Sequence, residues 1–310
     1  MRYSSPLRYP GGKSRIANFI KLLMIKNDLV GGEYAEPYAG GAGVALFLVI
    51  EGYASRVHIN DLDQSIYAFW HAVVKNTDAL CKLIEETEVT IDEWKRQRAI
   101  QQELRKTNLS KEGLLRLGFS TFFLNRTNRS GIVRGGGVIG GLEQESKWGI
   151  DSRYYVETLI KRIERIASHR DNIQIYYWDA LKFLQKKVPE LSSKSLIYLD
   201  PPYIENGDNL YQNEYKLRDH REIAKAVREA SKSWLVSYDN SEKVNDLYRG
   251  CRSIVYDLNY SARRRYKGSE VMFISDDLIL PEFEHPTQIT KDRLQKASSE
   301  SGQSELLHVE

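Results

Sequence analysis

The chain has few of the features that define several common protein classes. Its 310 residues include only two cysteines, Cys81 and Cys251, and neither belongs to a Cys-x-x-Cys pair. The sequence therefore predicts neither a disulfide-stapled scaffold nor a zinc site, and we expect no bound metal. The longest fully apolar run, 43–50, is too short to cross a bilayer. Residues 1–13 also lack the apolar core of a secretory signal peptide, so we expect no membrane association.

Positive charge is concentrated in one part of the chain, although the formal net charge is only +3. Residues 95–134 contain ten lysines and arginines but only two acids. A second basic group, ARRRYKG, occupies 262–268. Such concentration is typical of a surface that binds a polyanion such as nucleic acid. A solvated helix face gives the same pattern without any ligand, so charge alone leaves both interpretations open.

Short runs rich in β-branched and aromatic residues predict strands, and helical patterns separate most of them. This alternation is typical of a doubly wound, mostly parallel α/β sheet covered on both faces. We predict a discontinuous α/β domain (1–75 and 151–280), a mainly helical insertion (76–150), and a polar, disordered tail (281–310). The predicted strands are 34–38, 56–61, 173–179, 195–200, 234–239, 253–258 and 270–275. Examples of predicted helices are 14–27, 42–52, 154–169 and 220–230.

Two glycine-rich turns, in 7–15 and 34–48, precede predicted helices. Neither completes a phosphate-binding motif. The Walker pattern requires a glycine where Leu7 stands, and the dinucleotide fingerprint requires one where Leu46 stands. Such turns still bring backbone N–H groups close to a ligand, although a simple helix start is the alternative.

Two of the predicted strands deliver acids at their carboxyl ends. Asp61 follows the second strand, where an acid commonly accepts hydrogen bonds from ribose hydroxyls, and capping of the next helix by Asp63 is the rival interpretation. A later strand runs directly into DPPY (200–203). A plain Asp-Pro-Pro turn would not require Tyr203, which favours a functional interpretation.

Taken in order, these motifs resemble the D12, or Dam-like, class of site-specific DNA adenine-N6 methyltransferases. Residues 122–141 are similar to the FFLNR-type segment of that family's target-recognition insertion, and the resemblance covers about 6–275. It implies a Rossmann-like methyltransferase core with an antiparallel last strand. It also implies S-adenosylmethionine as methyl donor and double-stranded DNA as partner. The ordered motifs are YPGGKS, EPYAGGAG, NDLD and DPPY.

The resemblance also assigns individual residues. In DPPY, Asp200 and the carbonyl of Pro201 would each accept one N6 hydrogen of a flipped-out adenine, while Tyr203 stacks on the base. The two prolines fix φ and stiffen the turn, and extruding the base costs a few kcal/mol. The implied catalytic residues are Asp200, Pro201, Pro202 and Tyr203. The implied cofactor-binding residues are Tyr9, Lys13, Glu36, Tyr38, Gly40, Gly41, Asp61, Asp179 and Asp200.

Within the insertion, the residues expected near DNA are Asn125, Arg126, Arg129 and Arg134. The arginines read bases or contact phosphate only, and Asn125 alternatively caps a turn. Beyond Arg134 the sequence departs from the closest Dam pattern, so we do not assume GATC as the target. A catalytically inactive DNA-binding module remains an alternative, as does methylation of cytosine N4 or RNA adenine. We further expect a cytoplasmic, bacterial or phage-encoded protein with a cognate restriction endonuclease as possible partner.

Overall fold

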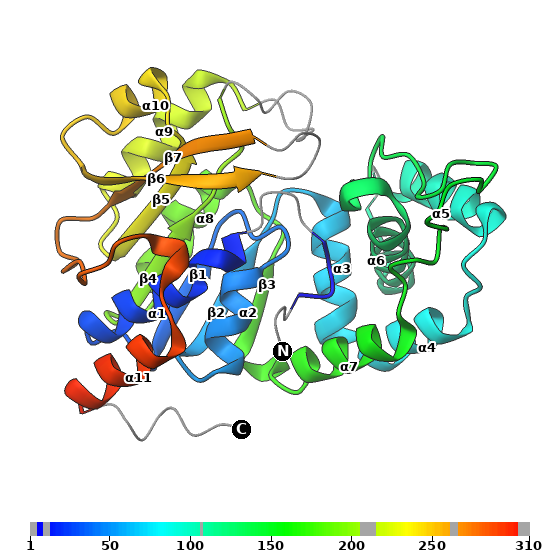
Figure 1. Cartoon of the computed structure of the whole chain (residues 1–310), viewed down its shortest axis with the longest axis horizontal. Helices are drawn as coiled ribbons and strands as arrows, with labels where there is room; N and C mark the ends of the chain where they lie inside the picture. The colour runs from blue at the N-terminus through cyan, green and yellow to red at the C-terminus, as the bar shows by residue number, and fades with distance from the viewer. Residues whose placement is uncertain (1–4, 9–12, 106–107, 205–214, 261–265, 303–310) are drawn as a thin grey trace.

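The computed structural model describes residues 5–8, 13–105, 108–204, 215–260 and 266–302 (Figure 1). Its strands are β1 (Gly32–Glu36), β2 (Ala54–Asn60), β3 (Ile173–Tyr176), β4 (Ser195–Leu199), β5 (Ser233–Asp239), β6 (Arg252–Tyr260) and β7 (Tyr266–Ile274). They form one sheet in the order β3-β2-β1-β4-β5-β7-β6. The first five strands of this order run parallel, and β7 is antiparallel to both β5 and β6. The predicted mostly parallel α/β sheet with an antiparallel end is confirmed.

Helices cover both faces of the sheet because side chains along each buried strand alternate between the faces. Tyr34 and Leu196 belong to the apolar cluster on one face, whereas their neighbours Ala35 and Ile197 belong to the cluster on the other. The first face carries α1 (Ala17–Lys26), α2 (Gly43–Ile50) and α3 (Gln64–Lys75). The second carries α8 (Ala180–Lys186), α9 (Leu217–Arg228) and α10 (Glu242–Leu247). Among the described residues, no helix combines the length and apolarity of a membrane span.

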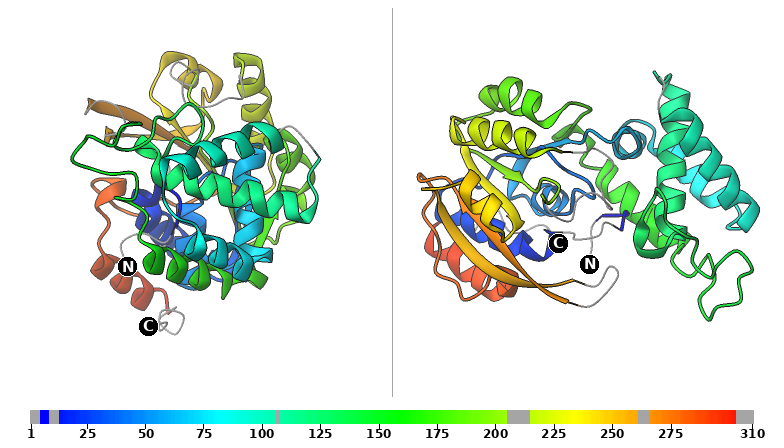
Figure 2. Two further views of the ribbon diagram at one scale, coloured as in Figure 1. Left: turned by 90° about the vertical axis from the view of Figure 1, so that its right-hand side faces the viewer. Right: turned by 90° about the horizontal axis from the view of Figure 1, so that it is seen from above.

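A helical region stands beside the sheet, with α3 between the two (Figures 1 and 2). It contains α4 (Thr77–Glu86), α5 (Ile91–Leu104), α6 (Lys111–Thr127) and α7 (Val156–Ala167). The approach of α6 to α3 requires Gly118, since a Cβ there would lie 2.5 Å from the carbonyl oxygen of Ala68. Helices therefore fill much of the interval where an insertion was expected, and the division into two domains stays a prediction.

The expectation of a disordered tail over 281–310 is wrong for most of that segment. It contains α11 (Lys291–Glu300), which packs against α1. Leu294 is buried in this contact, and the ring of Phe283 meets that of Phe19 edge-on with centroids 5.0 Å apart. A few apolar side chains in a polar segment were enough to dock one helix, a pattern too sparse to predict helix burial. The final residues of the expected tail lie outside the described part.

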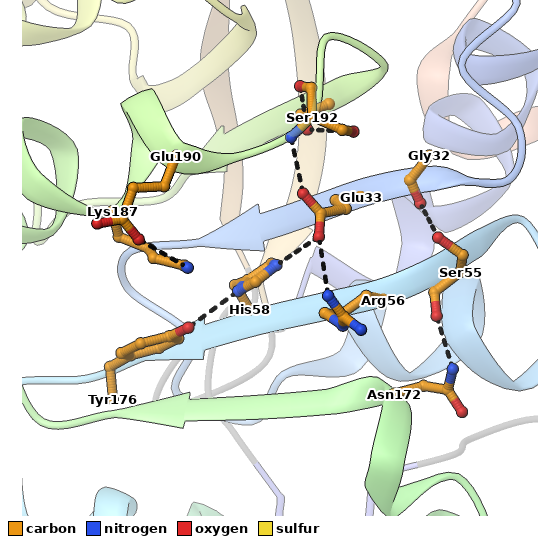
Figure 3. A network of polar contacts seen from close by, with 11 residues as sticks. Gly32, Glu33, Ser55, Arg56, His58, Asn172, Tyr176, Lys187, Glu190 and Ser192 are labelled. Carbon is orange, nitrogen blue, oxygen red and sulfur yellow. Dashed lines mark hydrogen bonds and ion pairs between the residues drawn. The ribbon is translucent and has the colours of Figure 1, made fainter.

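A polar network ties β1, β2 and β3 to the turn before β4 (Figure 3). The Glu33 carboxylate accepts the N–H of Ser192 at 2.8 Å and lies 3.4 Å from His58 Nε2. On its other side, His58 Nδ1 lies 3.1 Å from the Tyr176 hydroxyl. Burial lowers the pKa of His58 to about 4, so the imidazole is neutral at neutral pH. The network therefore links the edge strand β3 to β2 and β1 by hydrogen bonds that involve a neutral histidine.

Candidate active site

The predicted site residues gather at the carboxyl ends of the parallel strands. Glu36 is the last residue of β1, and Asp200 directly follows β4. These strands are neighbours, but the chain continues from β1 to β2 on one side and from β4 to β5 on the other. Such a reversal of strand order is where open α/β sheets bind their ligands. Asp200 and Glu36 therefore flank the expected ligand crevice.

Asp200 is held at the tip of β4 by a cation and a hydroxyl. Its Oδ1 atom lies 3.4 Å from Lys13 Nζ and accepts a hydrogen bond of 3.2 Å from Ser237 Oγ on β5. Ser237 Oγ in turn lies 2.6 Å from the Tyr198 hydroxyl. Burial raises the pKa of Asp200 to about 6, opposed by the charge of Lys13 and reinforced by that of Glu270. The side chain is still 29% exposed, so a ligand can reach it.

Glu270 on β7 joins this site through Lys13, and sequence reasoning missed it. Its carboxylate accepts hydrogen bonds from Lys13 at 2.5 and 2.7 Å, from the Tyr203 hydroxyl at 2.6 Å and from the Tyr256 hydroxyl at 3.1 Å. Burial acts to lower the pKa of Lys13, but Asp200 and Glu270 together outweigh burial and raise it. The one feature of the sequence that pointed to Glu270 was its position as a single acid at the start of the apolar run EVMFIS.

The DPPY turn presents its residues to the same region. Pro201 is buried, whereas Pro202 and Tyr203 are partly exposed. Lys13 Nζ donates to the Tyr203 hydroxyl at 3.1 Å and lies 5.5 Å from the centre of its ring. Lys13 and Tyr203 therefore fix one another beside Asp200. Within the described ranges, no three His, Cys, Asp or Glu side chains come together as a metal-binding group.

Glu36 and the glycine turn after β1 form a second part of the site. Glu36 Oε1 accepts the N–H of Ala45, in the first turn of α2, at 3.0 Å, and the Tyr34 hydroxyl at 3.1 Å. Burial raises the pKa of Glu36 to about 8. Gly40, followed by Gly41, has a φ of 46°, in the left-handed region that suits glycine. The turn therefore depends on glycine to bring its backbone back across the sheet edge.

Asp61, at the end of β2, holds that turn in place. Its two carboxylate oxygens accept the N–H groups of Gly40 and Asp63, each at 2.8 Å. Burial raises the pKa of Asp61 to about 7, with a further contribution from Asp63. A small cavity beside Asp61 is lined partly by Trp70 and Tyr176. The role of Asp61 toward a ribose stays a prediction.

Asp179 and Tyr38 lie near a residue that the sequence analysis did not single out. Asp179 caps α8 by accepting the N–H of Leu181 at 2.8 Å. The Tyr215 hydroxyl lies 3.2 Å from that of Tyr38 and 3.5 Å from Asp179 Oδ2. Asp179, Tyr38 and Tyr215 thus form one polar and aromatic group. Tyr9, which was expected to bind the cofactor, lies outside the described residues.

Asn125, one of the four residues expected near DNA, is instead buried at 2% exposure. Its Oδ1 atom accepts the N–H of Arg8 at 2.7 Å, and its Nδ2 group donates to the carbonyls of Arg8 and Gly131, both at 2.8 Å. Both amide hydrogens are therefore used inside the protein. This geometry contradicts a DNA contact in the described conformation and agrees with the alternative role in holding a turn.

The three arginines occupy different environments. Arg126 is also buried, so it would have to move to contact DNA, and its DNA-binding role stays a prediction. Burial, together with the nearby charge of Arg162, lowers its pKa to about 10, and its Nε atom has no hydrogen-bond partner among the described residues. Arg129 is exposed. Arg134 forms an ion pair with Asp63, the residue that caps α3. Of the four residues, Arg129 is therefore placed to meet DNA without rearrangement, whereas Arg134 would first have to leave Asp63.

Comparisons with known proteins agree with one another. A family model described as D12 class N6 adenine-specific DNA methyltransferase matches residues 9–262. Type II methyltransferase M.MjaIII of Methanocaldococcus jannaschii is 23% identical over an alignment of 211 positions that covers 64% of this chain and 68% of that protein. Modification methylase StsI of Streptococcus sanguinis is 24% identical over an alignment of 207 positions that covers 64% of this chain but 28% of that protein.

A solved structure of an S-adenosylmethionine-dependent methyltransferase from Agrobacterium tumefaciens aligns with a TM-score of 0.36 and 12% sequence identity. The alignment covers 83% of this chain and 61% of that one. The fold described above rests on the strand order and direction of this sheet, and not on that alignment.

Proposed function

This chain belongs to the D12 class of N6 adenine-specific DNA methyltransferases, and we propose that it transfers a methyl group from S-adenosylmethionine to N6 of an adenine flipped out of double-stranded DNA. The observation that carries the proposal is the place of Asp200. It follows β4 at the reversal of strand order, between Lys13 and Ser237, on the same sheet edge as Glu36. A carboxylate so placed can accept a hydrogen bond from a substrate that enters the crevice.

Asp200 and the turn after it address the main chemical difficulty of the reaction. Adenine N6 is a poor nucleophile because its lone pair is delocalised into the purine ring. Asp200 and the Pro201 carbonyl each accept one N6 hydrogen, which draws the nitrogen toward tetrahedral geometry and localises the lone pair. Pro201 and Pro202 keep the turn stiff, and Tyr203 offers its ring to the base. Catalysis in this scheme comes from positioning and from the charge of Asp200.

The residues at the ends of β1 and β2 fit the proposed cofactor. Glu36 and Asp61 are carboxyl groups whose raised pKa values, about 8 and about 7, reflect burial. A ligand that carries positive charge and donates hydrogen bonds would favour their ionised forms. When bound, S-adenosylmethionine supplies an electrophilic methyl group. Once methylated, N6 must lose a proton, and Asp200, hydrogen-bonded to that amine, is placed to receive it.

The basic segment supports duplex DNA as the substrate. Lysines and arginines in 95–134 can contact phosphates, which supplies affinity, and exposed Arg129 is the first candidate. The names of the two relatives, a type II methyltransferase and a modification methylase, suggest a restriction-modification setting. The protein would then act in the cytoplasm. A restriction endonuclease with the same recognition sequence would then be the functional partner.

Expression in a host without adenine methylation tests the proposal most directly. Sequencing of the host DNA should show N6-methyladenine at one recurrent sequence, and Asp200→Asn should abolish the mark while DNA binding persists. S-adenosylmethionine should also raise the melting temperature of the purified protein, as ligand linkage requires. Abundant folded enzyme that leaves DNA unmodified would refute the proposal. Methylation confined to cytosine N4 or to RNA would instead reassign the substrate.

A further inference from the structure

We propose that Glu270 is a positioning residue for methyl transfer: it holds Lys13 away from Asp200, and so keeps the Asp200 carboxylate available to the adenine amine. The inference rests on the proposed function. It assigns a role to a residue outside the four ordered motifs, on a strand, β7, that carries none of the predicted site residues.

The distances around Lys13 show which carboxylate is its principal partner. Lys13 Nζ lies 2.5 and 2.7 Å from the two oxygens of Glu270, but 3.4 Å from the nearest oxygen of Asp200. Charge-assisted N–H···O bonds are usually about 2.7–2.9 Å long. The contact with Glu270 is therefore a close ion pair, whereas the contact with Asp200 is a looser one. Lys13 lowers the negative potential at Asp200 without saturating its oxygens.

Burial determines how Glu270 can act. Its side chain is fully buried, so it cannot itself touch DNA or cofactor. A buried carboxylate requires donors, and Glu270 has them from Lys13, Tyr203 and Tyr256, which lie on three separate segments. Two of these donors, Lys13 and Tyr203, line the catalytic turn. Glu270 therefore influences the reaction through the positions of those two side chains.

Loss of the Glu270 charge would change the electrostatics of Asp200 in a definite direction. Lys13 would be free to close on Asp200, occupying the oxygen needed by the substrate, and the repulsion between the two carboxylates would disappear. Both changes lower the pKa of Asp200 below its value of about 6. In the described part, the titratable groups around Glu270 are Lys13, Tyr203, Tyr256, Tyr198 and Asp200. Lysine and tyrosine do not titrate at acid pH, so a shift there reports on a carboxylate.

Glu270→Gln tests the role of the charge, with Tyr256→Phe as a control that removes one hydrogen bond but no charge. At neutral pH, Glu270→Gln should lower kcat about 10- to 100-fold, the scale expected for misplaced catalytic groups, with little change in KM for DNA. The acid limb of its kcat profile should move below that of the wild type. A carbon-13 carboxyl titration of the cofactor-free protein, with Asp200 assigned through Asp200→Asn, should show the same shift. Tyr256→Phe should leave that titration unchanged.

An Asp200 titration that stays in place or moves to higher pH in Glu270→Gln would overturn the inference and leave Glu270 a structural residue. A second comparison tests the route through Lys13: Glu270→Gln should lower kcat less in the Lys13→Met background than in the wild type, and additive losses would also overturn the inference. If Glu270→Gln does not fold, Glu270→Asp, which retains the charge, should keep the wild-type Asp200 titration. The wild-type enzyme can also fail to methylate DNA while Glu270→Gln still shifts the Asp200 titration. In that case the proposed function would be wrong, but the electrostatic effect of Glu270 on Asp200 would stand.

Discussion

The side-chain amide of Asn125 hydrogen-bonds to both the N–H and the C=O of Arg8, at 2.7 and 2.8 Å. The contact joins the end of α6 to the amino-terminal segment, 117 residues earlier in the chain. Arg8 lies shortly before Lys13 in the sequence, so a helix of the basic region is tied to the chain just ahead of the proposed catalytic centre. This relationship makes Asn125 part of the framework, although its motif had indicated a place near DNA.

Asn125→Ala should therefore lower stability without altering sequence recognition. Loss of the amide leaves the carbonyl of buried Gly131 and the backbone groups of half-buried Arg8 without this partner, which should cost about 1–3 kcal/mol of unfolding free energy. Urea unfolding measures the loss, and sequencing of methylated DNA measures recognition. A variant of normal stability with a relaxed target sequence would contradict this assignment.

Arg129→Ala should weaken DNA binding, because the exposed guanidinium can meet a phosphate. Its salt dependence, the slope of log K against log salt, should fall by about 1. Fluorescence anisotropy at several salt concentrations measures both effects. Relaxed sequence preference in addition would show that Arg129 reads a base.

Arg126 provides the matched comparison, because it is buried where Arg129 is exposed. Arg126→Met should keep or increase stability, since replacing a buried charge by an apolar side chain of similar size is often neutral or stabilising. The DNA-binding salt slope of this variant should match that of the wild type. A fall in slope equal to that of Arg129→Ala would mean that Arg126 reaches phosphate after a rearrangement.

Glu36 should make the cofactor-free protein less stable as pH rises. Its folded-state pKa of about 8 lies above the ordinary 4.5, so between these values the folded state binds more protons than the unfolded state. The stabilisation is complete below about pH 4.5 and is lost as pH rises through about 8. Melting temperatures at pH 5 and pH 8.5 should differ less in Glu36→Gln than in the wild type. Asp61 and Asp200 act in the same direction, so part of the slope should remain.

Leu294→Ala should show that α11 is an integral part of the fold. Truncation of this buried side chain should cost about 2–5 kcal/mol. The control is Lys296→Ala on the exposed face of the same helix, which should change stability by about 0.5 kcal/mol or less. Equal, small effects of both substitutions in urea unfolding would mean that α11 is only loosely attached.

The sequence predicted the sheet well because its strands are short apolar runs with clear ends. It also singled out the turn that we propose to be catalytic, since Asp200 to Tyr203 are contiguous and a single motif contains them all. Glu270 could not be predicted in the same way, because its contact with Lys13 joins residues 257 positions apart. Only the pairing of β7 beside β5 brings that acid to the site.

The misplaced expectations have a common physical cause. A motif specifies residue types, but burial depends on what the rest of the chain packs against them. Asn125 lies in a segment typical of DNA recognition, yet it is buried and its amide hydrogen-bonds to the backbone of Arg8. Likewise α11 is polar over most of its surface, and the few apolar residues that dock it, such as Leu294, are too sparse to stand out in the sequence.

Arg134 forms an ion pair with Asp63. If Arg134 contacts DNA, as proposed, the Asp63 carboxylate competes with DNA for its guanidinium. On its proposed role, Arg134 must leave Asp63 before it can serve a phosphate or a base. A DNA sequence whose acceptor groups bind the guanidinium less well than Asp63 would leave the ion pair intact. A DNA sequence with better acceptors would draw Arg134 away from Asp63. On this proposal the overall affinity would be lower, but binding to wrong sequences would lose more than binding to the right one, so the competition would increase specificity.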